Sequence, residues 1–143
     1  MNELSSTQAQ RQIVETVIRL AQPGAACRFI VSGDAALCGA LRADGLRAIG
    51  LETDPIGRGQ YAVGIVAGAR SRAALGVAIA RVVPFLAGAA TMMVLIEDGC
   101  GLGPQAGTLL APFGFRIEAG VHCKRGLLLS AHRDAAEAMA VAA

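Results

Sequence analysis

Short apolar runs alternate with segments of helical periodicity along most of the chain. Apolar residues within 13–21 recur on one helical face and Pro23-Gly24 follows them, which predicts an amphipathic helix within residues 1–23. Ser5–Thr7 offer candidate N-caps for this helix. The next apolar run, Cys27–Val31, lies between Pro-Gly and Ser-Gly-Asp, a pattern typical of a buried parallel strand.

The same reasoning predicts the remaining elements. Further strands are expected at Leu46–Leu51, Tyr61–Val66, Thr91–Ile96, Phe115–Glu118 and Leu127–Ala131. Helices are expected at Ala35–Asp44, Arg72–Phe85 and Pro104–Ala111, followed by a weak helix or frayed tail at Asp134–Ala143. Because strands and helices alternate through short connections, the pattern predicts an α/β fold, a three-layer Rossmann-like sandwich with a mostly parallel sheet. The last two strands are too close for a helical crossover, so they should form an antiparallel hairpin.

Composition narrows the classes of function. The 143 residues are 54% apolar, which suits a single domain over residues 1–143. A net charge of +2 and an aromatic content of 3% argue against nucleic-acid binding. The first residues lack a secretory signal pattern, and the longest apolar stretch, Val82–Ile96, is interrupted by Pro84 and Gly88. We therefore expect a cytoplasmic protein without a membrane span.

The four cysteines, Cys27, Cys38, Cys100 and Cys123, form no Cys-x-x-Cys pair and no zinc-type spacing with the two histidines. No metal site is expected, and reduced, buried or half-buried thiols agree with a cytoplasmic location.

Ligands of open α/β sheets bind at the carboxyl ends of the parallel strands. In this chain those ends carry Ser32, Gly33 and Asp34, then Glu52 and Asp54, and then the segment 67–70. The acidic residues have two interpretations at this point, as solvated turn residues or as contacts to a ligand.

The order of elements over about residues 10–133 resembles that of class I S-adenosylmethionine-dependent methyltransferases. The segment 31–35, Val-Ser-Gly-Asp-Ala, falls where the family has its G-x-G-x-G loop, and Glu52 falls on its ribose-binding acid. The segments 61–68, 82–98 and 109–133 resemble the family's fourth strand, its fifth strand with the preceding helix, and its final hairpin. The resemblance implies S-adenosylmethionine as the cofactor, with Ser32, Gly33, Asp34, Glu52 and Asp54 as binding residues.

The chain departs from the family pattern at the positions that carry chemistry. Gly33 alone remains of the three loop glycines, and Val31 and Ala35 should crowd the place of the adenosyl group. The acid that precedes the family's loop is replaced by Phe29, and residues 66–69 contain no general base. No catalytic residue is therefore assigned.

Other candidate sites each have a simpler explanation. The segment 97–103, Glu-Asp-Gly-Cys-Gly-Leu-Gly, is either a turn after a strand or a nucleotide- or anion-binding loop, with Cys100 as a candidate reactive thiol. The segment 122–124 is either a solvent-exposed turn or a metal or catalytic cluster. Arg70 and Arg72 either receive an anion or are surface residues.

These observations lead to a first hypothesis of a reduced, non-catalytic methyltransferase-like domain that acts as a binding or assembly subunit. Its partner would be another protein or a second copy, docked on the N-terminal helix or on the segment 82–96. The alternatives are an active small-molecule methyltransferase completed by a partner chain, and a nucleotide- or anion-binding module that uses the segment 97–103.

Overall fold

A computed structural model of the chain describes residues 3–53, 55 and 57–142. Its strands are β1 (Arg28–Ser32), β2 (Arg47–Gly50), β3 (Tyr61–Val66), β4 (Leu86–Glu97), β5 (Arg116–His122) and β6 (Gly126–Arg133). Its α-helices are α1 (Glu3–Ala21), α2 (Ala35–Ala43), α3 (Arg72–Val82), α4 (Gly103–Leu110) and α5 (Ala135–Ala142). Short 3-10 turns follow β2, α3 and α4, and they are η1 (Leu51–Thr53), η2 (Val83–Phe85) and η3 (Ala111–Phe113).

The strands form one sheet in the order β2-β1-β3-β4-β6-β5. β1 pairs in parallel with β2 and β3, β3 pairs in parallel with β4, and β6 runs antiparallel to both β4 and β5. β5 therefore points the same way as β1–β4, and β6 is the reversed strand. The predicted α/β fold with a mostly parallel sheet and a closing antiparallel hairpin is confirmed.

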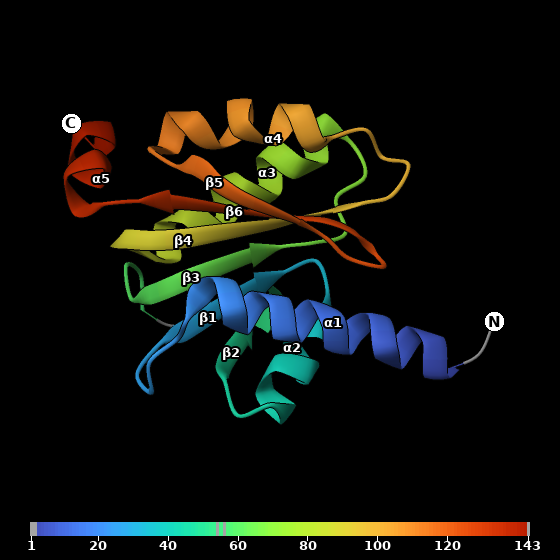
Figure 1. The fold of residues 1–143 in the computed structure, drawn as a ribbon. Coiled ribbons are helices and arrows are strands. Elements are labelled where there is room, and N and C mark those ends of the chain that lie inside the picture. The colour runs from blue at the N-terminus through green and yellow to red at the C-terminus, as the bar shows by residue number, and fades with distance from the viewer. Residues whose placement is uncertain (1–2, 54, 56, 143) are drawn as a thin grey trace.

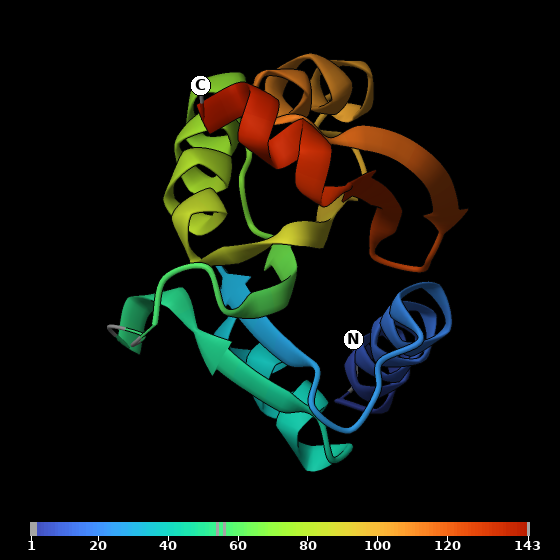
Figure 2. The ribbon, with the colours of Figure 1, turned by 90° about the vertical axis from the view of Figure 1, so that its left-hand side faces the viewer.

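Helices cover both faces of the sheet (Figures 1 and 2). α1 and α2 pack on one face around buried residues such as Phe29, Leu37 and Met93. α3 and α4 pack on the other face, around Ile79 and Met92 among others. Because successive strand residues point to opposite faces, neighbours such as Met92 and Met93 enter different apolar layers.

Several expected boundaries were wrong. α1 begins at Glu3, so Ser5–Thr7 lie inside its first turns and do not cap it. β4 extends back to Leu86 because Leu86 pairs with Tyr61 and Ala90 with Arg133, which recruits a stretch of small residues that looked like a turn. β5 and β6 are longer than expected for the same reason, and residues 123–125 alone join them. The C-terminal segment is a helix rather than a frayed tail through residue 142.

One candidate docking surface is also wrong. The segment 82–96 was expected to offer apolar surface to a partner, but β4 lies inside the sheet between β3 and β6, and Met92–Ile96 are buried on both faces. On the N-terminal helix, Ile13, Val14 and Val17 are likewise buried in the core.

Candidate functional site

The carboxyl ends of the parallel strands gather most of the predicted site residues. Ser32 ends β1 and is buried, Gly33 follows it, and Asp34 precedes α2. Glu52 lies in η1, directly after β2. Asp54 lies outside the described residues. The structure thus brings four of the five predicted residues to one edge of the sheet.

Gly33 is held against the end of β3. The Ala67 N–H donates to the Ser32 carbonyl over 2.9 Å, and Gly33 has a φ of +88°, in the left-handed region that favours glycine. A Cβ on Gly33 would overlap the Ala67 carbonyl oxygen, and a Cβ on Gly68 would come within 2.7 Å of the Gly33 oxygen. Contact between the two strand ends therefore explains the glycine at position 33 without a ligand.

Glu52 joins the same loop. Its Oε1 accepts a hydrogen bond from the Gly33 N–H over 3.1 Å, so the carboxylate predicted to bind ribose touches the predicted glycine loop. A crevice of about 220 Å³ lies beside this contact, and Val31, Ala35, Cys38 and Glu52 contribute to its lining. Val31 is 1% exposed, and its side chain packs in the core below α1 and α2. Val31 therefore forms a wall of the crevice from inside the core.

Asp34 is committed to two structural contacts. Its Oδ1 accepts from the Leu37 N–H over 2.9 Å and caps α2, and its Oδ2 lies 2.8 Å from Nη1 of Arg125. N-caps of this kind stabilise a helix by satisfying N–H groups that have no partner in its first turn. A side chain with both oxygens engaged offers little to a ligand.

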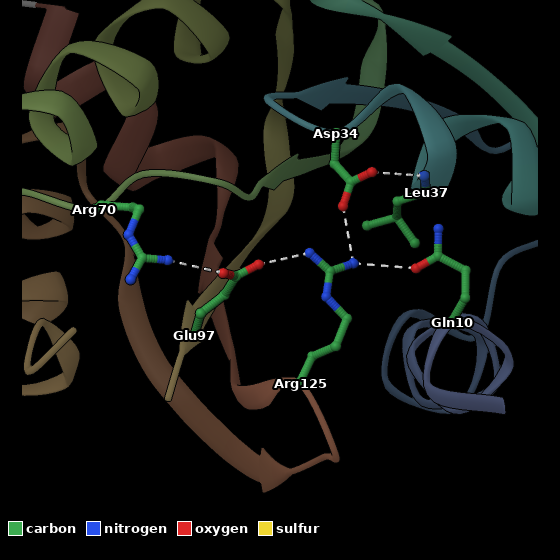
Figure 3. Close-up of polar contacts among 6 residues, drawn as sticks. All are labelled: Gln10, Asp34, Leu37, Arg70, Glu97 and Arg125. Carbon is green, nitrogen blue, oxygen red and sulfur yellow. Dashed lines mark hydrogen bonds and ion pairs between the residues drawn. The ribbon is translucent and has the colours of Figure 1, made fainter. Parts of the chain in front are cut away.

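Arg125 is the centre of an ion-pair cluster at the carboxyl edge of the sheet (Figure 3). Besides Asp34, its guanidinium contacts Glu97 Oε1 at 2.7 Å and donates to the Gln10 Oε1 at 3.1 Å. Arg70 lies 3.3 Å from the other oxygen of Glu97. Partial burial lowers the pKa of Arg125, but its hydrogen bonds and charge contacts with Glu97 and Asp34 outweigh this and raise the pKa above its ordinary value.

Sequence reasoning missed Arg125. The residue lies in the turn between β5 and β6, and its partners come from α1, the N-cap of α2 and β4, so no local spacing marks it. The available signal was topological, because β5 runs parallel to β1–β4 and its end must reach the same edge.

The other candidate sites, the segment 97–103 and the arginines at 70 and 72, either form contacts within the chain or lie at the surface. Glu97, the first acid of the segment 97–103, is paired with two arginines, and Cys100 packs partly buried against the α3–α4 layer. Arg72 is the exposed first residue of α3, whose N-cap is Ser71. These contacts leave Arg70 and Glu97 less available to an anion or a nucleotide than the sequence suggested.

The turn at 122–124 is docked rather than free. The Lys124 N–H donates to Gln12 Oε1 over 2.7 Å, and Cys123 Sγ lies 3.8 Å from the Thr16 hydroxyl, so the turn rests on α1. The side chains of His122 and Lys124 are exposed, as expected, but Cys123 is half-buried.

Within the described ranges, no three His, Cys, Asp or Glu side chains are placed to bind a metal ion. Among the helices of these same residues, none is both long and apolar enough for a bilayer crossing.

Burial raises the pKa of the Cys27 thiol, and it also raises the pKa of the Cys38 thiol.

Comparisons with solved structures define the fold class. The chain resembles a release-factor-specific protein-(glutamine-N5) methyltransferase from Alicyclobacillus acidocaldarius, with a TM-score of 0.56 and 15% identity over 88% of this chain and 92% of that one. It also resembles a TehB-like SAM-dependent methyltransferase from Corynebacterium glutamicum, with a TM-score of 0.54 and 12% identity over 85% and 87% of the two chains. A 16S rRNA methyltransferase from T. thermophilus, in complex with AdoMet and guanosine, gives a TM-score of 0.56 and 13% identity over 89% of this chain and 38% of that one.

The chain has the Rossmann-like fold of class I methyltransferases. No protein-family model matches its sequence, and no curated protein matches it either. At these identities the likeness concerns the fold, because one fold carries many different activities.

Proposed function

We propose that this methyltransferase-like domain does not transfer methyl groups and acts as a binding or assembly subunit. The observation that carries the proposal is the Arg125 cluster, in which Asp34 and Glu97 are paired across the carboxyl edge. Two acidic side chains of this edge are thereby satisfied by Arg125 within the chain itself.

Several features of this edge argue against S-adenosylmethionine as a cofactor of the chain. Glu52 has the position of a ribose-binding acid, but its carboxylate accepts the Gly33 N–H. The crevice beside it has about 220 Å³, and Val31 and Ala35 are part of its lining. The end of β3 carries Val66 and Ala67, both buried and apolar, so it supplies no base for an acceptor. No step of methyl transfer is therefore assigned to this chain.

Calorimetric titration with S-adenosylmethionine and S-adenosylhomocysteine tests the proposal. We expect no saturable heat with either ligand up to about 1 mM, because the edge is occupied by its own side chains. Micromolar binding that disappears in Glu52→Ala and persists in Glu118→Ala would contradict the proposal. It would favour the alternative of an active methyltransferase completed by a partner chain. Glu118 is a suitable control because it is an exposed acid on β5.

The cytoplasmic location and the absence of nucleic-acid binding stay predictions from composition. An assembly role also implies a partner protein or a second copy, and light scattering of the purified chain distinguishes a monomer from a homo-oligomer.

A further inference from the structure

The strand β2 leaves one end of the sheet open (Figure 1). Within the described residues its strand neighbour is β1, with Arg47 opposite Arg28 and Gly50 opposite Val31. An edge strand has main-chain N–H and C=O groups that point away from the sheet and can pair with a further strand. This edge ends at Gly50, whose carbonyl accepts the Thr53 hydroxyl over 2.7 Å.

A cleft of about 350 Å³ lies beside the first part of β2. Its lining includes Gly45–Ile49 together with Arg28, Arg42 and Arg47. Arg28 and Arg47 are register partners on adjacent strands, so their side chains leave the sheet on the same face. Two like charges at such positions destabilise the pair unless an opposite charge lies between them.

Among residues 3–53, 55 and 57–142, no ion pair supplies that opposite charge. Arg28 donates to the Gln60 side-chain oxygen over 2.7 Å and lies 5.1 Å from the centre of the Tyr61 ring, and both groups are neutral. Arg42 and Arg47 are exposed, and neither forms an ion pair with a described residue. Three cationic side chains therefore surround the cleft without a described anionic partner.

Two carboxylates near β2 belong to residues that the structure describes, and both lie outside the lining of this cleft. Glu52 lies beyond the far end of the strand and holds the Gly33 N–H. Asp44, at the C-terminus of α2, lines the groove between α1 and α2 instead of this cleft. The charge of the edge is thus positive at its Arg47 end and acidic beyond Gly50.

We propose that the open edge of β2 binds an extended segment of a partner protein as an added strand, and that acidic side chains of this segment lie between the arginines. The proposal rests on the assembly role proposed above and names the class of partner. Main-chain hydrogen bonds would supply affinity, and the side chain of the added strand opposite Arg47 would lie in the same cross-strand row as Arg47 and Arg28. The polarity of the edge requires the acidic residues to lie beside Arg47 and away from Glu52.

Two other occupants suit this surface less well. A phosphate group would satisfy the arginines but leave the strand edge unpaired. A second copy of the chain would bring its own Arg42 and Arg47 to an edge that is already positive, and such like-charge contacts act against self-pairing.

Fluorescence anisotropy with a labelled peptide of about eight residues that alternates glutamate and valine tests the proposal. We expect saturable binding that Arg47→Glu weakens at least about tenfold, because it reverses a charge that faces the peptide. Arg19→Glu, at an exposed position on α1, makes the same change in net charge and should leave binding unchanged. A peptide that alternates lysine and valine should not bind.

Hydrogen exchange of the complex separates strand addition from attraction between charges. We expect the amides within residues 46–50 to exchange more slowly when the acidic peptide is bound. No binding, unchanged exchange in β2, equal binding of the lysine peptide, or an Arg47→Glu variant that binds normally would each overturn the proposal. Dimerisation through β2, or preferential binding of an RNA oligonucleotide lost in Arg47→Glu, would overturn it in favour of another occupant.

The non-catalytic role and the strand addition at β2 are tested by different measurements. Micromolar S-adenosylmethionine binding contradicts the non-catalytic role and leaves the peptide result unaffected, because the β2 cleft and the Gly33 crevice are lined mainly by different residues. Arg47 is exposed, so a matching thermal unfolding curve for Arg47→Glu is expected and excludes loss of the fold.

Discussion

Gly33 and Gly68 face each other where β1 and β3 end. Both have positive φ values, of 88° and 80°, and each lies where an added methyl group would meet the other loop's backbone. In many nucleotide-binding loops a glycine makes room for a ligand. Here the room is taken by protein backbone, which cannot move aside without breaking the Ala67 to Ser32 hydrogen bond.

We therefore predict that Gly33→Ala lowers the free energy of unfolding by about 2–4 kcal/mol, because it adds backbone strain to a steric overlap. Gly39→Ala is the matched control, since Gly39 lies inside α2 and a methyl group there would contact nothing beyond the backbone of its own helix. That change should stabilise the protein by about 0.5–1 kcal/mol through helix propensity. Urea denaturation measures both, and a Gly33→Ala variant as stable as the parent chain would contradict the packing argument.

The sequence identified residues whose role depends on local position. Gly33, Asp34 and Glu52 could be assigned to one edge because each follows an apolar strand. The roles of Arg125 and Arg133 could not be predicted from local position, because their partners are distant in the chain. Arg133 is buried and donates to the carbonyl oxygens of Ala87, Gly88 and Phe113 at 2.9 to 3.0 Å, and burial lowers its pKa.

At the scale of the element, α5 is held by a reciprocal cap. The Asp134 side chain accepts from the Glu137 N–H over 2.7 Å, and the Asp134 N–H donates to the Glu137 carboxylate over 3.1 Å. The same carboxylate lies 3.3 Å from Arg116 of β5. The hydrogen bond from the Glu137 N–H lowers the pKa of Asp134 below its ordinary 3.8, and the charge of Arg116 acts in the same direction.

This shift predicts that α5 loses helicity in acid. A carboxyl group whose folded pKa is lowered contributes stability above its unfolded pKa, and that contribution disappears as the pH falls through the folded value. NMR carbon shifts of residues 135–141 should therefore move towards coil values below about pH 4. Asp134→Asn keeps a capping oxygen that does not titrate, so much of this pH dependence should vanish. An unchanged titration in that variant would contradict the assignment to Asp134.

Element types could be predicted better than element ends. Tyr61–Val66 was predicted with its observed bounds, and the first residue of α3 was correct, because apolar periodicity and the Ser71 cap are local signals. β4, β5 and β6 are longer than predicted, since pairing between strands ordered residues that have weak strand preference on their own.

At the scale of the whole molecule, the sheet separates two apolar layers. Leu37 of α2 is fully buried on one face and Ile79 of α3 on the other. Strands β1, β3 and β4 contribute to both layers, so neither layer can lose its packing without exposing the other side of the same strands. The single domain over residues 1–143 stays a prediction from the sequence, and the shared strands predict that the two layers unfold together.

We predict that Leu37→Ala and Ile79→Ala each lower the free energy of unfolding by about 2–5 kcal/mol and that each variant unfolds in one transition. Circular dichroism and the fluorescence of Tyr61, which lies in the α3–α4 layer, should report the same midpoint for a given variant. Two separate midpoints, or a Leu37→Ala change that leaves the tyrosine signal unaffected until higher urea, would show that the layers unfold independently.

The overall architecture could be predicted because alternating strands and helices leave few connections that bury both faces of a sheet. The side-chain contacts at the ligand-binding edge could not be predicted, because they depend on which side chains from α1, the N-cap of α2, β4 and the β5–β6 turn meet there. The same topology would have served an open, cofactor-binding edge equally well.

The docking of the β5–β6 turn on α1 also bears on how the chain is made. Gln10 and Gln12 hydrogen bond to Arg125 and Lys124, which are translated 115 and 112 residues after them. These bonds cannot form while the hairpin is still inside the exit tunnel of the ribosome. The first helix therefore lacks its contacts with the β5–β6 turn during most of the synthesis of residues 1–125. Completion of the native tertiary structure is thereby postponed until the β5–β6 hairpin has left the tunnel.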